Sequence, residues 1–416
     1  MDLASVPDGV AVSTETASLL DGVGPLDALV GVAAAGHGGP GLPALDAAAA
    51  ALGALLPDRP TAVLAVDTTG LDGTREALAA WRDGVGGGPA RVWLEPATAL
   101  EPPPDLLSLV MAGRRLGSPA CALLDARRGK LSPDQLMALL APVLAGQSDL
   151  ACPVYARAAS EGTLTSNLLV PLTRALYGRR VTQLAAGGLA VSGALLKRCL
   201  DGGGPDPRWQ GPGLEIWLAT EALASGSSMV EVGLGSRPAE PDSAPVDLAT
   251  TLVQAVGAVL ALMDRHATMW LDVHETAAVP RQGLSTPLRA NLALPNIDRM
   301  VRGFRLGLKD LLPVWEQIMP EATLARLYPL GLLASDEFRF PDQLWARVIS
   351  DFAVGHHERR LPQDHLLRAL TPLYLGRVAA FLVQAEGRTA EQVAGLIEST
   401  AQAFEAEKSN LVARWR

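Results

Sequence analysis

The sequence predicts an α/β protein, with a central sheet in the amino-terminal half and an all-α carboxyl-terminal part. Up to about residue 177, short apolar runs alternate with longer stretches of helical spacing, and from residue 297 onward the spacing is helical throughout. The order strand, helix, strand favours right-handed crossovers and parallel strands. With 416 residues, 49% of them hydrophobic, the chain can bury the large core that such a fold needs.

The expected strands of the amino-terminal half are compact apolar runs that end at small or polar residues. They are 28–33, 62–66, 91–94, 121–124 and 149–155. Helices are expected between and after them, at 45–56, 75–81, 106–116, 133–144 and 164–177. Ser132 and Pro133 are favoured residues for a helix cap and a first turn, and Gly178 is a favoured terminator.

The carboxyl-terminal half follows a Pro-rich linker at 238–245. A long helix is expected over 248–270, because apolar residues recur on one face, and an irregular stretch is expected over 277–295. Further helices are expected at 297–319, 322–329, 341–354, 363–384 and 389–413. Gly, Pro and Asp residues separate these segments, which indicates a helical domain.

Two aspartates end predicted strands. Asp67 follows the second strand and Asp125 the fourth. The carboxyl ends of strands in an open α/β sheet form the crevice that binds ligands, so both side chains are expected to point into one crevice. One carboxylate would suit the base or ribose of a nucleotide, and the other a position nearer the phosphates. Helix capping is the alternative role for both residues.

Several further segments carry recognisable motifs. They are 67–74, 125–127, 163–178, 187–188, 213–218 and 232–237. Their order along the chain resembles one group of bacterial glycosyltransferases: GT-A-fold enzymes related to family 2 transferases and to the mannosylglycerate and glucosyl-phosphoglycerate synthases. In this resemblance Asp125-Ala126-Arg127 stands where the group has Asp-x-Asp.

The resemblance implies a GT-A fold, that is, a Rossmann-like sheet that binds a nucleotide-diphosphate sugar, with an all-α carboxyl-terminal domain. The implied boundaries are a catalytic-type domain at 1–240, a linking helix and loop at 241–295, and a helical domain at 296–416. The implied activity is transfer of a hexose to a small polar acceptor such as glycerate. In the group the helical domain shapes the acceptor pocket or a homodimer contact.

The resemblance also implies roles for individual residues. Asp125 would face the donor's ribose or metal-diphosphate, and Asp67 its base and ribose. Gly187 and Gly188 would let the backbone approach the sugar or acceptor, since a side chain there would block it. Glu215 would be the general base near the acceptor hydroxyl. The alternative for Glu215 is a first-turn carboxylate favoured by the helix dipole.

The chain departs from the group at the metal-binding positions. The last Asp of Asp-x-Asp is Arg127, and the expected metal-binding His falls on Ala239. The expected site for Mg²⁺ or Mn²⁺ therefore lacks two of its ligands, and no metal ligand is assigned. Either Arg127 and Arg128 replace the metal, because guanidinium groups pair with phosphate in a two-pronged way, or the chain is an inactive binding or scaffold relative. Asp125 and Glu215 remain, which favours a transferase.

Near the carboxyl terminus, Pro372 is expected to kink a helix or start a new one. Arg377 could reach an acceptor site, but we expect it to pair with Glu358 or Asp364 in a contact between helices.

Bulk properties exclude several function classes. The net charge is −9 and no basic stripe is visible, so no nucleic-acid partner is expected. The amino terminus lacks a basic leader, no apolar run reaches about 18 residues, and the three cysteines are scattered, so a cytoplasmic protein without a transmembrane segment is expected. Glycine-rich dinucleotide, phosphate-loop and serine-hydrolase motifs are missing from the sequence.

Overall fold

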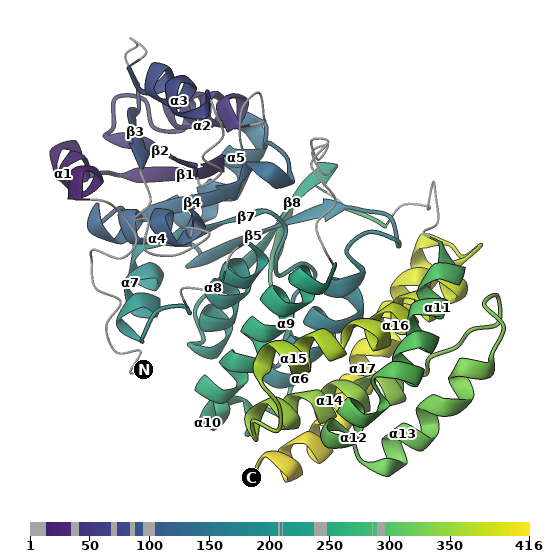
Figure 1. Cartoon of the computed structure of the whole chain (residues 1–416). Helices are drawn as coiled ribbons and strands as arrows, with labels where there is room; N and C mark the ends of the chain where they lie inside the picture. Colours follow the sequence, from purple (N-terminus) through teal and green to yellow (C-terminus); the bar gives the residue numbers. More distant parts are fainter. Residues whose placement is uncertain are drawn as a thin grey trace. The chain divides into compact units, whose positions relative to one another are not determined.

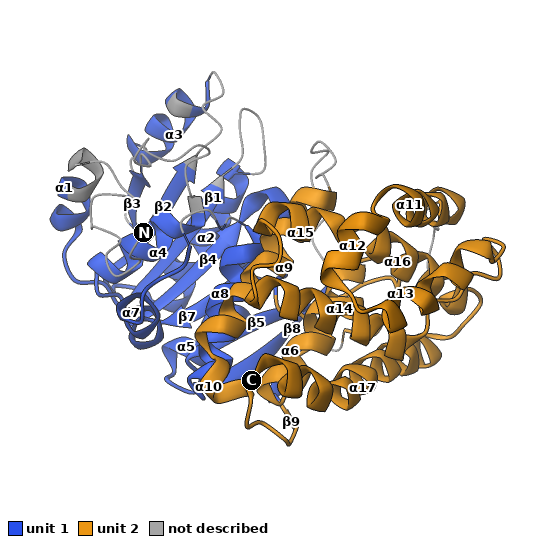
Figure 2. Cartoon of the chain, turned by 60° about the horizontal axis from the view of Figure 1, so that its bottom comes forward, with its two compact units in different colours: residues 1–155, 185–245, 279–285 blue, residues 156–184, 246–278, 286–416 orange. Residues whose placement is uncertain are grey.

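The computed structural model describes residues 14–34, 41–67, 73–83, 88–94, 105–206, 209, 211–236, 248–284, 286–288 and 296–416. The chain divides into two compact units (Figure 2), an α/β unit and a helical unit. The α/β unit comprises 1–155, 185–245 and 279–285, and the helical unit comprises 156–184, 246–278 and 286–416. Both units are discontinuous, unlike the predicted boundaries, because the segment 156–184 packs with the carboxyl-terminal helices.

The α/β unit contains an eight-stranded sheet of order β10-β8-β5-β7-β4-β1-β2-β3 (Figure 1). Its strands are β1 (Ala28–Ala34), β2 (Thr61–Asp67), β3 (Ala90–Leu94), β4 (Ala120–Asp125), β5 (Leu150–Ala156), β7 (Gly188–Ser192), β8 (Met229–Ser236) and β10 (Arg281–Gly283). The predicted parallel order holds for β4, β1, β2 and β3. An α/β fold with a helical second part is therefore confirmed.

The sheet is mixed, however, because β7 runs antiparallel to both β4 and β5. The sequence pattern predicts no strand at β7 or β10 and an irregular stretch at 277–295, which was wrong at β10 and at a short strand β9 (Ala277–Ala278). The direction of β7 follows from where the chain returns to the sheet. The turn before it already lies at the carboxyl end of β4, where the backbone N–H of Asp125 donates to the Gly187 carbonyl at 3.0 Å, so the chain runs back along β4.

Helices flank this sheet within the α/β unit. They are α1 (Thr14–Val23), α2 (Gly41–Leu55), α3 (Thr74–Asp83), α4 (Asp105–Arg115), α5 (Pro133–Leu144), α7 (Gly193–Asp201) and α8 (Pro212–Ala224). Val30 of β1, Leu45 of α2 and Leu139 of α5 are fully buried in one apolar core. The predicted start of α5 is confirmed, because the Ser132 hydroxyl accepts from the backbone N–H of Gln135 in a capping box.

The helical unit is built mainly from segments that the helical spacing predicts. It contains α6 (Val170–Tyr177), α9 (Leu248–Arg265), α10 (Ala267–Trp270), α11 (Ile297–Asp310), α12 (Leu312–Ile318), α13 (Glu321–Leu327), α14 (Asp342–His357), α15 (Gln363–Ala369), α16 (Thr371–Ala385) and α17 (Ala390–Trp415), with a short strand β6 (Arg179–Arg180) paired to β9. The expected helix 248–270 is interrupted at His266. Pro372 lies in the first turn of α16, so it starts a helix. Gly178 ends α6 in the left-handed conformation, as predicted.

Arg377 lies inside the helical unit with 2% of its surface exposed. Its guanidinium pairs with Asp342 at 2.7 Å and donates to the Asn167 side-chain oxygen at 2.9 Å. The expected partners Glu358 and Asp364 were therefore wrong, although the expected helix–helix contact is present. The Arg377 side chain is therefore buried and paired within the helical unit.

Two helical stretches of the described chain, Leu248–Arg265 and Gln363–Ala385, are long and apolar enough to cross a membrane by length and composition alone. They are weak evidence for a membrane span, because core helices have the same composition, and 72% of the second window is buried.

Candidate functional site

The candidate site lies at the carboxyl edge of β1, β2 and β4. In the sheet register Ala33 of β1 pairs with Asp125, and Ala34 pairs with Asp67. The backbones of the two aspartates therefore flank β1 at one edge, as the strand order predicts. The side chain of Asp67 lies outside the described residues, as do the segments that follow β1 and β2 in the sequence.

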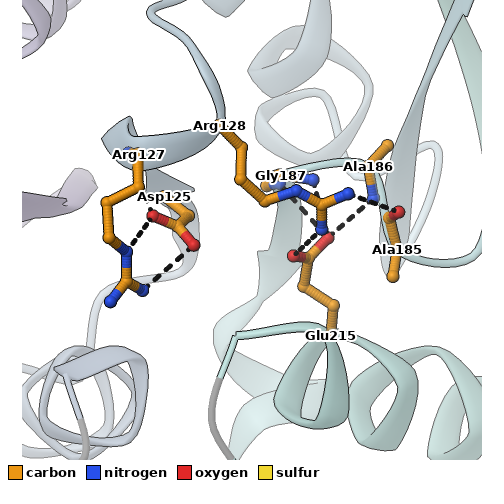
Figure 3. Close-up of polar contacts among 8 residues, drawn as sticks. Asp125, Arg127, Arg128, Ala185, Ala186, Gly187 and Glu215 are labelled. Atoms are coloured by element: carbon orange, nitrogen blue, oxygen red, sulfur yellow. Dashed lines mark hydrogen bonds and ion pairs between the residues drawn. The ribbon is translucent and has the colours of Figure 1, made fainter. Parts of the chain in front are cut away.

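Asp125 ends β4 and caps a single 3₁₀ turn, Ala126–Arg128. Its Oδ1 atom accepts from the backbone N–H of Arg127 at 3.1 Å and from Arg127 Nε at 2.7 Å, and its Oδ2 atom accepts from Arg127 Nη2 at 3.0 Å (Figure 3). The carboxylate is almost fully buried, whereas the Arg127 side chain is 34% exposed. The position of the last Asp in Asp-x-Asp is thus occupied by a partly exposed cation, Arg127. Its guanidinium binds both carboxylate oxygens of Asp125.

Glu215 lies in the first turn of α8 and is buried. Its Oε2 atom accepts from three consecutive backbone N–H groups, those of Ala186, Gly187 and Gly188, at 2.8, 3.0 and 3.3 Å. Burial raises the pKa of Glu215 above its ordinary value, while the charge of Arg128 and these backbone donors act in the opposite direction. The predicted base is therefore hydrogen-bonded to the turn that enters β7.

Arg128 connects the 3₁₀ turn to this carboxylate. Its Nη1 atom lies 3.5 Å from Glu215 Oε1, and its Nη2 atom donates to the Ala185 carbonyl at 3.5 Å. Figure 3 shows the guanidinium pointing across to the Glu215 carboxylate and the turn at 185–187. The side chain remains 25% exposed. Arg127 and Arg128 are adjacent in sequence, yet each pairs with a different buried carboxylate of the site.

Gly187 and Gly188 are required by the packing of the protein itself. Gly187 has a φ of +95°, and a Cβ built there would lie 3.0 Å from the Cβ of Arg128. A Cβ at Gly188 would lie 2.9 Å from the Leu123 carbonyl oxygen. The space beside both glycines is thus filled by Arg128 and β4. Their predicted contact with a sugar or acceptor stays a prediction.

A small pocket opens beside these residues. It is lined by Ala44, Leu124, Ala126, Arg128, Gly129, Lys130, Leu131, Leu136, Tyr155, Ala186 and Gly187. The pocket has room for roughly one water molecule. Its charged lining residues, Arg128 and Lys130, are both cationic, which favours an anionic ligand. Lys130 was not among the predicted site residues, although the basic run Arg127-Arg128-Gly129-Lys130 is a signal for it.

The resemblance implies a divalent cation at this site, but the described residues do not fit one. Among the residues that the structure describes, no group of three or more His, Cys, Asp or Glu side chains is close enough to hold a metal ion. Both oxygens of Asp125 accept from Arg127. Ala239, at the expected histidine position, lies outside the described residues and has no ligating group in its side chain.

Comparisons with known proteins give structural likeness only. No family model and no curated protein match the sequence. The chain is similar to a solved structure of a mycobacterial protein, at 19% identity over 64% of this chain and 79% of that one, with a TM-score of 0.42. It is similar to glucosyl-3-phosphoglycerate synthase from Mycobacterium tuberculosis with Mn²⁺, UDP and glucosyl-3-phosphoglycerate, at 18% identity over 60% and 84% of the two chains, with a TM-score of 0.42.

The same synthase with Mn²⁺, UDP-glucose and phosphoglyceric acid is similar at 19% identity over 61% of this chain and 83% of that one, with a TM-score of 0.42. The name of this enzyme is one that the sequence resemblance includes. At this identity the likeness extends no further than the arrangement of the chain, and it assigns no ligand to the site around Asp125.

Proposed function

We propose that the chain is a glycosyltransferase that transfers a hexose from a nucleotide-diphosphate sugar to a small, glycerate-like acceptor without a divalent cation. The observation that carries this proposal is the pair between Arg127 and Asp125, at 2.7 and 3.0 Å. It places a partly exposed guanidinium at the carboxyl edge of the sheet, where ligands of open α/β sheets bind. Arg128 and Lys130 add two further positive charges beside it.

The proposed chemistry explains why cations are needed at this edge. The acceptor hydroxyl oxygen forms a bond to the anomeric carbon while the bond from that carbon to the diphosphate breaks. The electron pair of the broken bond stays on the diphosphate, which gains negative charge, and a phosphate oxygen takes the acceptor's proton. Guanidinium groups bind phosphate oxygens in a two-pronged way and are always charged, so Arg127 and Arg128 stabilise the leaving group.

The proposal predicts binding of the donor in the presence of a chelator. Thermal shift and calorimetry of the full chain with UDP-, GDP- and ADP-sugars, each with EDTA or with Mn²⁺, should find one donor that binds equally well in both. Release of nucleoside diphosphate is then measured with glycerate and with phosphoglyceric acid as acceptors. Asp125→Ala should abolish turnover, because it removes the partner that orients Arg127. Failure of every donor to bind under either condition would refute the proposal.

Arg127→Asp gives a sharper test because it restores the Asp-x-Asp pattern. We expect it to weaken donor binding at least tenfold in EDTA, the effect of losing roughly one charge-assisted hydrogen bond, and to make binding depend on Mn²⁺. Arg59→Asp is the matched control. Arg59 pairs with Asp27 in the same two-pronged way, at 3.0 and 2.7 Å, but at the amino ends of β1 and β2. It should leave donor binding unchanged.

A second candidate is a protein that binds the sugar nucleotide without turnover. It is favoured by the hydrogen bonds that engage the carboxylates of both Asp125 and Glu215. The same assay separates the two functions. Donor binding that persists in EDTA, with no release of nucleoside diphosphate for any acceptor, would favour the binding protein.

A further inference from the structure

The carboxylate of Glu215 occupies a nest of main-chain donors. Successive backbone N–H groups that converge on one point form a concave site for an anion. Here those of Ala186, Gly187 and Gly188 converge on a single oxygen of Glu215, within 3.3 Å. The anion that fills the nest is therefore supplied by the chain itself, from a residue 27 to 29 positions away.

The other carboxylate oxygen faces Arg128 at 3.5 Å, so Glu215 connects two parts of the site. One is the turn at 185–188, which also accepts a hydrogen bond from the backbone of Asp125. The other is the Arg128 side chain, which packs over Gly187 with no room for a Cβ between them. A shift of this carboxylate would release the turn and the guanidinium together.

We propose that Glu215 is a positioning residue that fixes Arg128 and the 185–188 turn for donor binding, in place of the catalytic base that the family resemblance implies. This rests on the proposed function. A base needs a lone pair directed at the acceptor hydroxyl. Oε2 already accepts three N–H groups, more than its two lone pairs accommodate ideally, and Oε1 faces a cation.

Glu215→Gln separates the two roles. The amide keeps an oxygen for the backbone donors but loses the charge that holds Arg128. For a positioning residue we expect the KM for the donor to rise about tenfold, kcat to change less than threefold, and the acid limb of the kcat profile to remain. A kcat that falls a hundredfold or more with loss of the acid limb would identify a base and overturn the proposal, as would wild-type kinetics.

Glu76→Gln is the matched control. Glu76 occupies the first turn of α3, as Glu215 does on α8, but its side chain is exposed. Any effect of losing a first-turn carboxylate at a helix dipole appears in both variants. Only Glu215→Gln should change the KM for the donor.

An anion-rescue experiment tests the nest without using turnover. In Glu215→Ala the three N–H groups and Arg128 lose their anion, and acetate can fill the space of the missing carboxylate. We expect acetate, compared with chloride at equal ionic strength, to raise the Tm of Glu215→Ala but not of the wild type. If acetate does not raise the Tm of a folded Glu215→Ala or Glu215→Gly variant above its value in chloride, the nest is overturned. If acetate rescues Glu215→Ala but the wild type binds no nucleotide sugar, the proposed function is refuted and the nest is not.

Discussion

Replacing Arg377 by Met should destabilise the helical unit more than any surface arginine. The guanidinium pairs with Asp342 at 2.7 Å, and it donates to the Asn167 side chain, the Phe340 carbonyl and Thr400 at 2.9, 2.9 and 2.6 Å. Methionine fills part of the volume of the aliphatic stem but provides none of these donors. Three segments of the helical unit lose their common partner.

The size of the effect follows from these contacts. Removing one partner of a buried ion pair costs about 3–5 kcal/mol. The lower part of this range applies, because the Asp342 side chain is 20% exposed and still accepts from Ser399 at 2.7 Å. The buried acceptors on Asn167 and Phe340 lose a donor, at about 1 kcal/mol each. Because these terms overlap, we expect a loss of about 3–4 kcal/mol.

Native-state hydrogen exchange measures this loss locally, which a single unfolding midpoint cannot do in a chain with two units. Amides of α14 and α16 that exchange through opening of the unit should exchange at least about 100-fold faster, since 1.4 kcal/mol corresponds to a factor of ten. Arg388→Met is the matched control, because Arg388 is exposed, and it should change stability by less than about 0.5 kcal/mol. An effect of Arg377→Met below about 1 kcal/mol would show that the buried contacts are not net stabilising.

Two further predictions concern stability. Gly178→Ala should cost clearly more than Gly387→Ala in urea unfolding: both glycines lie in the helical unit and have a positive φ, +65° and +68°, but a Cβ at Gly178 would clash with the Glu275 carbonyl oxygen whereas Gly387 has open space. The control should cost about 1 kcal/mol, and equal costs would contradict the clash. Burial raises the pKa of Asp264, but His357, whose Nδ1 atom lies 2.6 Å from Oδ1, and His356, whose Nδ1 atom lies 3.6 Å from Oδ2, outweigh it and hold that pKa below its ordinary value. A carboxyl whose pKa is depressed in the folded state stabilises the fold at pH values above its unfolded pKa, and this stabilisation is lost as the pH falls through its folded pKa. Asp264→Asn should therefore flatten the loss of stability below about pH 4. An unchanged dependence of the urea midpoint on pH in the acid range would rule this out.

Much of the fold can be predicted from residues that are close together in the sequence. The strand–helix alternation, the Ser132 cap and the Gly178 terminator depend on residues a few positions apart, and each is found in the structure. The shared edge of Asp67 and Asp125 also follows from sequence, because parallel strands joined by crossovers end on the same side. The Asp125–Arg127 ion pair could also have been predicted from the sequence, since the two residues are two positions apart.

Tertiary structure alone decided what the distant residues contact. The amide groups of Ala186 to Gly188 and the carboxylate of Glu215 are 27 to 29 residues apart, and Arg377 is 35 positions from Asp342. No periodicity or propensity links residues at such separations, because local rules act over one or two helical turns. The reversed direction of β7 and the commitment of Glu215 to a backbone turn arise from where the chain returns to the sheet, and only the folded core fixes that point.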